Sequence, residues 1–482
     1  MTTDARRLTG VPLGLLVPLC AVAGMCLATW PVASSAAIFV AVALTVLATT
    51  AYPLMAAFFL FLVFQDPLQV LAGGETGWGL VVKRTDEPLV ILLGLGYLVL
   101  NRSVQASLGF RKLGLFIALC FAGLLLSSIP VRDWFPAAVD LALFSKPFFL
   151  FMIGLGLTLR PEGLHRRLDV ILWVMLACIA FGLVFLVMPR WQDAYVGDIR
   201  PPDERLGFLS AQGFFLGPGT YSWFAGATFA IAYAAYLSYK RMFYLTAALT
   251  SAAFVALSWR RKSIIAVMAM ILVSLLVRGT KGSRARSFAV LALSAALVVT
   301  VFAPYVGALW ASTMREYGNA DPYSSARGAL YYTSVLIVRD HFPFGSGLAS
   351  FASHASKLYY SSVYTEYGLS TIYGLSPVNS DYITDTFWPM VLGEGGLLCL
   401  AGYVAFFSVL VGATWTAARR VGSDPLHAFI ATAALLLLVG SLLESIASHI
   451  YGSSLQAALV LIPSGIAWRA ERDRVAASAP GS

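Results

Sequence analysis

Charged residues are scarce in this chain of 482 residues, in which 12% of the side chains are charged and 59% are hydrophobic. A soluble domain needs a polar surface that such a composition does not supply, so a soluble globular protein is excluded. The composition instead indicates an all-α polytopic membrane protein. We expect residues 1–482 to form a single integral membrane domain.

Cysteine is rare as well, and no paired cysteine spacing occurs in a polar connecting segment. This excludes a disulfide framework and indicates that the cysteines are small apolar packing residues. A nucleotide-binding glycine loop is also missing, because Gly94-Leu95-Gly96 lies inside an apolar run without the continuation that binds phosphate. We therefore expect no cofactor and no metal. The five cysteines, all inside apolar runs, are Cys20, Cys26, Cys120, Cys178 and Cys399.

Long apolar runs are abundant. Because a membrane helix needs about 20 mainly apolar residues, the sequence predicts about fourteen spans. The region 33–70 is ambiguous, since Pro53 and Asp66 also fit a re-entrant member. The first run lacks a small-residue cleavage site and is expected to be retained as a span. The predicted spans are 11–30, 33–49, 52–70, 87–101, 113–129, 134–158, 168–188, 218–237, 242–258, 263–277, 287–311, 386–411, 426–447 and 452–468.

Three consecutive cations, Arg260-Arg261-Lys262, separate the apolar runs 242–258 and 263–277. One helix through both runs would be roughly 54 Å long, against a hydrocarbon core of about 30 Å, so the chain must turn at the cations. Further cations flank this pair of runs, and the positive-inside rule assigns them to the cytoplasm. The triplet then lies on the outer side, close to the depth of lipid phosphates. The flanking cations are Lys240, Arg241, Arg278, Lys281, Arg284 and Arg286.

The other cations support the same orientation. Basic residues recur in the turns that span counting assigns to the cytoplasm, such as Arg166-Arg167 and Arg419-Arg420. The net charge of +9 is therefore interpreted as membrane topology and attraction to anionic lipid. Nucleic-acid binding is not expected, because no basic domain outside the membrane is present.

Two outer segments hold most of the polar residues outside the spans. The first, 189–217, is predicted to be a loop in which Arg205 precedes an aromatic and glycine-rich return to the membrane. Its neighbours Asp203 and Glu204 also fit a solvated, self-compensating loop. The second, 312–385, is about seventy residues long, too long for a simple connector, and is predicted to be a large periplasmic loop with helical segments. Its tyrosines suit sugar stacking, but they also suit a membrane interface.

Three motifs in this order resemble the bacterial O-antigen polymerase and O-antigen ligase superfamily, which includes exopolysaccharide polymerases. They are the serine-arginine turn 257–263, the stretch from Arg327 to the Pro-x-Gly-x-Gly pattern at 343–347, and the stretch 381–396 that enters a span with Glu394-Gly395-Gly396. The resemblance covers roughly 190–410. It implies a GT-C-like membrane glycosyltransferase of the bacterial inner membrane, with its active site facing the periplasm.

The resemblance also implies the chemistry. Such a protein transfers a glycan from undecaprenyl diphosphate to an acceptor hydroxyl without nucleotide sugar or metal, and arginine suits a diphosphate leaving group because its planar donors stay charged. Implied partners are the lipid-linked oligosaccharide, membrane lipid, a chain-length regulator and a flippase. The residues expected to be catalytic are Arg260, Arg327, Asp381 and His354, and those expected to bind diphosphate are Arg205, Arg261, Lys262 and Arg339.

Alternatives stay open. Ligases of the superfamily carry a His-Asn pair where this chain reads Val378-Asn379, which favours a polymerase over a ligase. A lipid-linked oligosaccharide flippase also fits the number of spans, although no repeated halves are seen. The general base is not assigned, and its candidates are Asp381, Asp385, His354, His341 and Glu366. His341 also fits the end of the helical segment that precedes it. Asp381 and Asp385 share a face if that segment is helical.

Buried charges are expected inside the spans as well. Lys146 is an intramembrane cation and so a functional candidate, but an ion pair with Asp140 or snorkelling to the interface also fits it. Glu394 and Glu444 are expected to pack against hydroxyl groups or arginines.

Overall fold

The structure is a computed structural model that describes residues 53–74, 76–100, 113–131, 133–157, 159, 162–196, 203–205, 208–278, 307, 321–420 and 424–478. These residues are mainly helical, with one short hairpin. The chain divides into two compact units, Met1–Arg84 with His165–Tyr221, and Thr85–Leu164 with Ser222–Ser482. Each unit is described by itself.

The first unit contains α3 (Pro53–Leu71), α4 (Gly77–Arg84), α9 (Leu164–Val187) and α10 (Pro189–Val196), followed by the strands β1 (Glu204–Arg205) and β2 (Phe208–Leu209). The strands pair antiparallel, with Arg205 opposite Phe208. The carboxylate of Asp66 in α3 accepts a hydrogen bond of 2.8 Å from the Leu216 backbone N–H. The predicted loop 189–217 is therefore partly ordered by its own helix and hairpin.

The second unit is a bundle of long apolar helices with a polar segment at one end. Its helices before that segment are α5 (Asp86–Leu100), α7 (Leu113–Ser127), α8 (Trp134–Gly156), α11 (Pro218–Tyr239), α12 (Met242–Leu257) and α13 (Arg261–Arg278). The bundle closes with α19 (Trp388–Arg419), α20 (Pro425–Glu444), η3 (Ser445–Ala447) and α21 (Ser454–Ser478). α19 packs along α7, α13 along α20, and α21 along α8.

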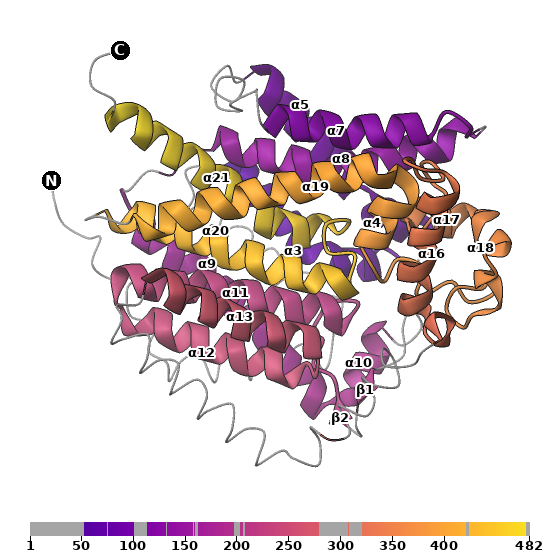
Figure 1. Ribbon diagram of the computed structural model, residues 1–482. Helices are drawn as coiled ribbons and strands as arrows, with labels where there is room; N and C mark the ends of the chain where they lie inside the picture. Colours follow the sequence, from indigo (N-terminus) through magenta and orange to yellow (C-terminus); the bar gives the residue numbers. More distant parts are fainter. Residues whose placement is uncertain are drawn as a thin grey trace, which may run out of the picture. The chain divides into compact units, whose positions relative to one another are not determined.

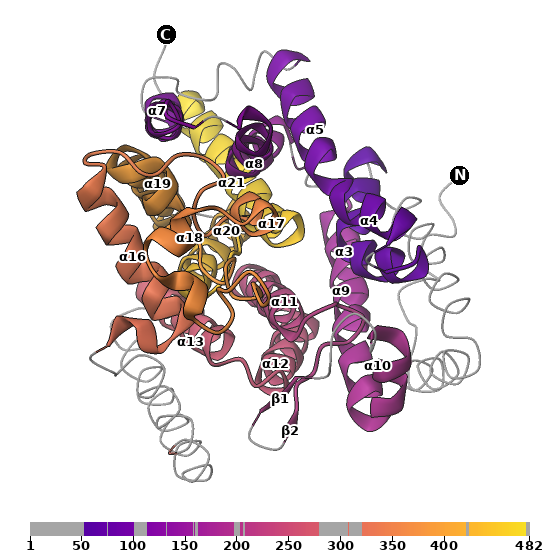
Figure 2. The same cartoon turned by 90° about the vertical axis from the view of Figure 1, so that its right-hand side faces the viewer.

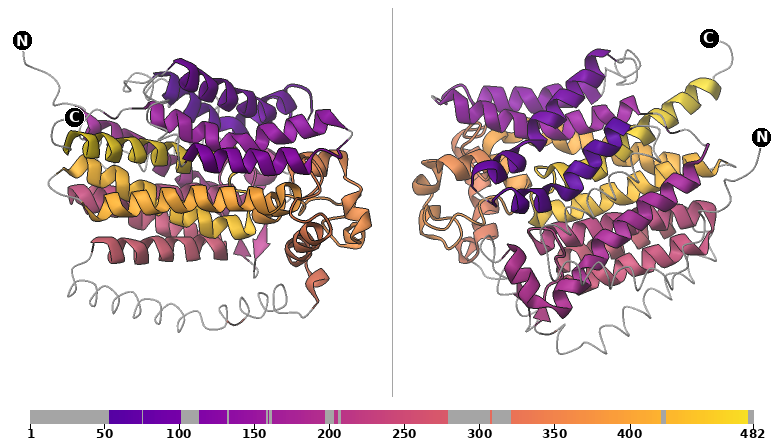
Figure 3. Two further views of the ribbon diagram at one scale, coloured as in Figure 1. Left: turned by 45° about the horizontal axis from the view of Figure 1, so that its top comes forward. Right: turned by 180° about the vertical axis from the view of Figure 1, so that it is seen from behind.

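The polar segment between α13 and α19 contains η1 (Pro322–Ser324), α16 (Ala326–Asp340), α17 (His354–Tyr359), α18 (Val363–Glu366) and η2 (Leu369–Thr371). α16, α17 and α18 gather at one end of α19 and α20 (Figure 1). In Figure 2 the same three helices lie in front of the ends of the bundle helices, and Figure 3 shows them at that end from two further directions. Helices therefore occur in the described part of the predicted loop 312–385.

Every predicted span that falls on described residues coincides with a helix. Within the described part of the chain, five helices are long and apolar enough to cross a membrane, which supports a helical membrane protein. Spans 11–30, 33–49 and 287–311 lie outside the described residues. The five helices are Leu54–Leu71, Trp134–Gly156, Leu164–Val187, Trp388–Arg419 and Pro425–Ala447.

Contacts at the two ends of α20 fix the direction of α13. Lys262, at the start of α13, contacts Glu444 at the end of α20, and Arg278, at the end of α13, donates a hydrogen bond of 3.0 Å to the Ala428 carbonyl near the start of α20. The two helices are therefore antiparallel. This confirms that the cation triplet and Arg278 lie at opposite helix ends.

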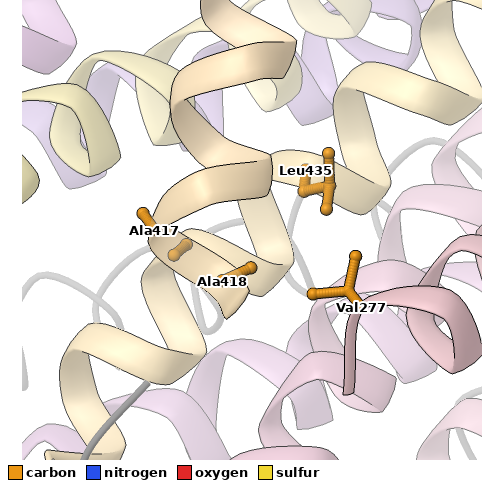
Figure 4. Close-up of a cluster of buried hydrophobic side chains, with 5 residues drawn as sticks. Val277, Ala417, Ala418 and Leu435 are labelled. Atoms are coloured by element: carbon orange, nitrogen blue, oxygen red, sulfur yellow. The ribbon is translucent and has the colours of Figure 1, made fainter. Parts of the chain in front are cut away.

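Small and branched side chains hold the helix ends together on the side of Arg278. Val277 of α13, Ala417 and Ala418 of α19, and Leu435 of α20 are all buried in one cluster (Figure 4). Alanine at the contact lets the helix backbones approach closely, as is common between membrane helices. The charged groups described next lie at the other end of the same helices.

Candidate functional site: a cation cluster at the polar end of the bundle

The cation triplet lies at the tight turn between α12 and α13. Trp259 has a left-handed backbone with φ 53°, and the Ser258 hydroxyl donates a hydrogen bond of 2.6 Å to the Val255 carbonyl, closing α12. α13 begins at Arg261, so the three cations occupy the last turn residue and the first two helical residues. The predicted turn at the cations is confirmed.

Lys262 is held by the end of α20. Its ammonium lies 3.4 Å from Oε2 of Glu444 and donates a hydrogen bond of 3.3 Å to the Ala447 carbonyl. The other oxygen of Glu444 accepts a hydrogen bond from the Ser263 hydroxyl, which is itself 2.8 Å from the Ser222 hydroxyl. Glu444 is 1% exposed, so it is a buried counter-ion for the start of α13. The expected packing of Glu444 against hydroxyls is confirmed, and its cationic partner is a lysine.

Arg327 approaches from the polar segment. It is the second residue of α16, whose N-cap Ser325 accepts a hydrogen bond of 3.1 Å from the Gly328 N–H. Its guanidinium makes a 2.7 Å hydrogen-bonded ion pair with Asp385. One turn further along α16, the Tyr331 hydroxyl donates a hydrogen bond of 2.8 Å to the Ile446 carbonyl in η3. This bond ties the start of α16 to the same helix end that holds Lys262.

The charged side chains at the start of α13 interact with those at the start of α16. The ammonium of Lys262 interacts electrostatically with Arg260, Arg327 and Asp385, in addition to Glu444. We call Arg260, Lys262 and Arg327, with their counter-ions Asp385 and Glu444, the cation cluster. Three cations against two carboxylates leave it with excess positive charge. Arg261, half-buried at the first position of α13, adjoins it in sequence.

Arg339 lies far from Arg327 although both belong to α16. Twelve residues separate them, which corresponds to about 18 Å along a helix axis. Arg339 is exposed and pairs with Asp340 at 3.0 Å. Hydrogen bonds from Arg339 and Tyr367 lower the pKa of Asp340. His341 caps the C-terminal end of α16, which is the role of helix termination that its position predicts.

Asp381 and Asp385 do not share a helix face. α19 begins only at Trp388, so the segment 381–385 is not helical and the condition for a shared face is not met. Pro389 is the second residue of α19, and proline is common in the first turn of a helix. Asp381 is exposed and lies 3.5 Å from the Lys357 ammonium, whereas Asp385 contacts Arg327.

His354, the other residue expected to be catalytic, is the first residue of α17 and is exposed. It interacts electrostatically with His449, which sequence reasoning missed. Nδ1 of His449 lies 3.5 Å from the Thr386 carbonyl. Burial, together with the charges of Lys146 and His354, lowers the pKa of His449 to about 4. The sequence signal for His449 was its position in the polar link between the predicted spans 426–447 and 452–468.

The partner predicted for Lys146 is wrong. Its ammonium donates a hydrogen bond of 2.8 Å to the Gly452 carbonyl and lies 3.6 Å from Glu87 and 4.0 Å from Asp86, at the start of α5. Both acids therefore reach a cation in α8. Asp140 of the same helix has a different partner, described below.

The second and third motifs are packed against each other. The Ser346 N–H donates to the Gly393 carbonyl at 2.8 Å, and the Leu397 N–H donates to the Pro343 carbonyl at 3.0 Å. α19 is broken between these bonds, because Gly396 has φ 67° and ψ −164°. A Cβ on Gly345 would lie 2.3 Å from the Gly393 carbonyl oxygen, so glycine allows the close backbone approach.

Arg205 belongs to the first compact unit, in β1. The cation cluster belongs to the second unit. Among the described residues, no group of three or more histidine, cysteine, aspartate or glutamate side chains is arranged to hold a metal ion.

No protein-family model matches this sequence, and no curated protein matches it significantly. Function is therefore inferred from the chemistry of the cation cluster.

Proposed function

We propose that this protein is a polysaccharide polymerase that transfers glycan repeat units from undecaprenyl diphosphate to an acceptor sugar hydroxyl. The observation that carries the proposal is that cations at the N-terminal ends of two helices lie close enough to interact electrostatically. Arg260 and Lys262 stand at the start of α13, and Arg327 stands in the first turn of α16. Helix N-termini already have partial positive charge, so cations there are unfavourable unless anions offset them, and Glu444 and Asp385 offset only two of the three cations.

A diphosphate suits such a cluster. In the proposed reaction the acceptor oxygen bonds to the anomeric carbon, the bond from that carbon to the phosphate oxygen breaks, and the lipid diphosphate leaves with the bonding electrons. Arg260 and Arg327 stabilise the charge that develops on the leaving group, because guanidinium groups donate two parallel hydrogen bonds to phosphate oxygens. Lys262 instead contributes positive charge to the cluster, since Glu444 and the Ala447 carbonyl already bind its ammonium.

The remaining parts of the proposal follow the resemblance described above. They are about fourteen spans in a GT-C-like arrangement, a site facing the periplasm from the inner membrane, and cooperation with a flippase and a chain-length regulator. The general base that accepts the hydroxyl proton stays a prediction for Asp381 and His354. Arg205 and Arg261 stay predicted diphosphate ligands, whereas Arg339 is not included because of its position at the far end of α16.

Purified protein in detergent should be given lipid-linked repeat units, and the length of the glycan chains should be measured. We expect chain lengthening by the native protein and loss of lengthening in Arg260→Ala and Arg327→Ala. Arg339→Ala is the matched control, since it removes the same residue type from the same helix. Lengthening in Arg327→Ala at the native rate contradicts the proposal.

The same assay separates the alternatives. A flippase gives no lengthening in detergent, where no two compartments exist. A ligase transfers the glycan to a different acceptor and does not join repeat units to one another.

A further inference from the structure

Two carboxyl groups meet inside the second unit, away from the cation cluster. Asp140 of α8 and Glu394 of α19 are both fully buried. Their carboxyl groups interact electrostatically with each other, and both adjoin the Ser353 hydroxyl. Sequence reasoning assigned Asp140 to Lys146 and gave Glu394 no acidic partner, so this pair is a finding of the structure.

Each carboxyl group uses one oxygen for the backbone of the same turn. Oδ2 of Asp140 accepts a hydrogen bond of 2.8 Å from the Ala349 N–H, and Oε1 of Glu394 accepts one of 2.8 Å from the Phe351 N–H. Oδ1 of Asp140 and Oε2 of Glu394 are both buried and accept no hydrogen bond from any donor among the described residues. A proton shared between the two carboxyl groups would satisfy both oxygens.

A hydrogen bond between two carboxyl oxygens requires a proton on one of them. Two adjacent carboxylates in a buried site repel each other and lose their hydration, so such pairs retain one proton and ionise in two separate steps. We infer that Asp140 and Glu394 form a proton-binding site whose single shared proton fastens the turn 349–353 to α8 and α19.

The turn needs to be held. Ala349 and Ala352 have left-handed backbones with φ 61° and 57°, a conformation that residues with a side chain adopt only when their surroundings impose it. A third bond, of 2.8 Å from the Ala352 N–H to the Tyr364 hydroxyl, joins the turn to α18. Removing the proton places two negative charges together beneath the turn and is expected to release it.

Other titratable groups adjoin the pair. Tyr364 of α18 interacts with both carboxyl groups, Cys399 of α19 interacts with Glu394, and Tyr403 of α19 interacts with Asp140. Tyrosine and cysteine are ordinarily neutral at neutral pH. They therefore do not supply a cation that would stabilise a doubly ionised pair.

Amide substitutions test the shared proton directly. Asparagine or glutamine resembles a protonated carboxyl group, because one end accepts a hydrogen bond and the other donates one. Asp140→Asn and Glu394→Gln each keep the bond to the backbone and supply a fixed donor to the remaining carboxylate. We expect both variants to fold, each with a constitutively fastened turn.

The first measurement is infrared spectroscopy of the purified protein at about pH 7, where an ordinary aspartate or glutamate is ionised. We expect a protonated-carboxyl band in the native protein that disappears in both amide variants. Asp133→Asn is the matched control, because Asp133 is an exposed carboxylate just before α8 that makes no cap bond. A spectrum without that band in the native protein overturns the inference.

The second measurement is hydrogen exchange of the peptide covering 346–353, compared between native protein and variants at one pH. At about pH 10 we expect roughly tenfold faster exchange in the native protein than in Asp140→Asn, because only the native pair loses its proton. Equal exchange in native protein and both variants at that pH contradicts the inference. If Asp140→Asn does not fold, Glu394→Gln gives the same comparison. Neither measurement depends on polymer growth, so its outcome is distinct from that of the proposed function.

Discussion

The ammonium of Lys262 lies 3.4 Å from the carboxylate of Glu444. Glu444 is the last residue of α20, and its side chain is 1% exposed. Removing one partner of a buried ion pair leaves the other charge uncompensated. We therefore expect Glu444→Ala to lower the free energy of unfolding by about 3 kcal/mol or more. The measurement is chemical or thermal unfolding in detergent.

Two comparisons make that prediction specific. The double variant Lys262→Met with Glu444→Leu removes both charges and should recover most of the loss. Asp381→Ala removes an exposed partner of Lys357 and should change the free energy of unfolding by less than about 1 kcal/mol. A double variant no more stable than Glu444→Ala would contradict a role for the ion pair.

Asp385 orients Arg327 through their 2.7 Å ion pair. In the proposed reaction, Asp385→Asn should lower kcat/KM for chain lengthening about tenfold, which corresponds to about 1.4 kcal/mol of transition-state stabilisation. The matched control is Asp340→Asn, which removes the carboxylate partner of the exposed Arg339 and should leave lengthening unchanged. Equal losses in both variants would mean that Asp385 acts only through the general stability of α16.

Gly396 cannot be replaced by alanine without strain. Its φ is 67°, and a Cβ there would lie 2.5 Å from the carbonyl carbon of Phe344. We expect Gly396→Ala to lower the free energy of unfolding by more than about 1 kcal/mol. Gly412→Ala, in the same helix with no atom within 4 Å of the added Cβ, should be neutral or stabilising. Equal unfolding midpoints for the two variants would contradict this account of the break.

His449 makes stability depend on acidity. The folded-state pKa of His449, about 4, is below the usual value of about 6.5. Between these two pH values the unfolded chain binds a proton at His449 that the folded chain does not bind. This contribution is fully present above about pH 6.5 and is lost as the pH falls towards 4, by roughly 3 kcal/mol at most. His449→Phe should flatten the unfolding free energy over that window. An unchanged pH profile in this variant would exclude His449 as the cause.

Features that depend on local periodicity and charge were accessible from the sequence. The turn at Arg260-Arg261-Lys262 followed from the length of the two apolar runs, and the helix ending at His341 followed from its residue pattern. The opposite placement of Arg278 followed from counting spans, and the contacts of α20 agree with it.

Side-chain contacts between different helices could not be predicted from the sequence. Lys146 and Asp140 lie on one helix, six residues apart, and their sequence proximity suggested an ion pair. Six residues place them on different faces of a helix, and each side chain meets an element far away in the chain, at Glu87 and at Glu394. His449 was overlooked for the same reason, because its burial and its contact with Thr386 arise only in the folded chain.

The interlocked backbones of 343–347 and 393–397 also constrain how this chain can vary. Because bonds run both from Ser346 to Gly393 and from Leu397 to Pro343, an insertion in either segment would shift one bond out of register with the other. A larger residue at Gly345 would require a compensating backbone shift at Gly393. Homologous chains should therefore keep both segment lengths and change these two positions together, a covariation that an alignment of such chains can reveal.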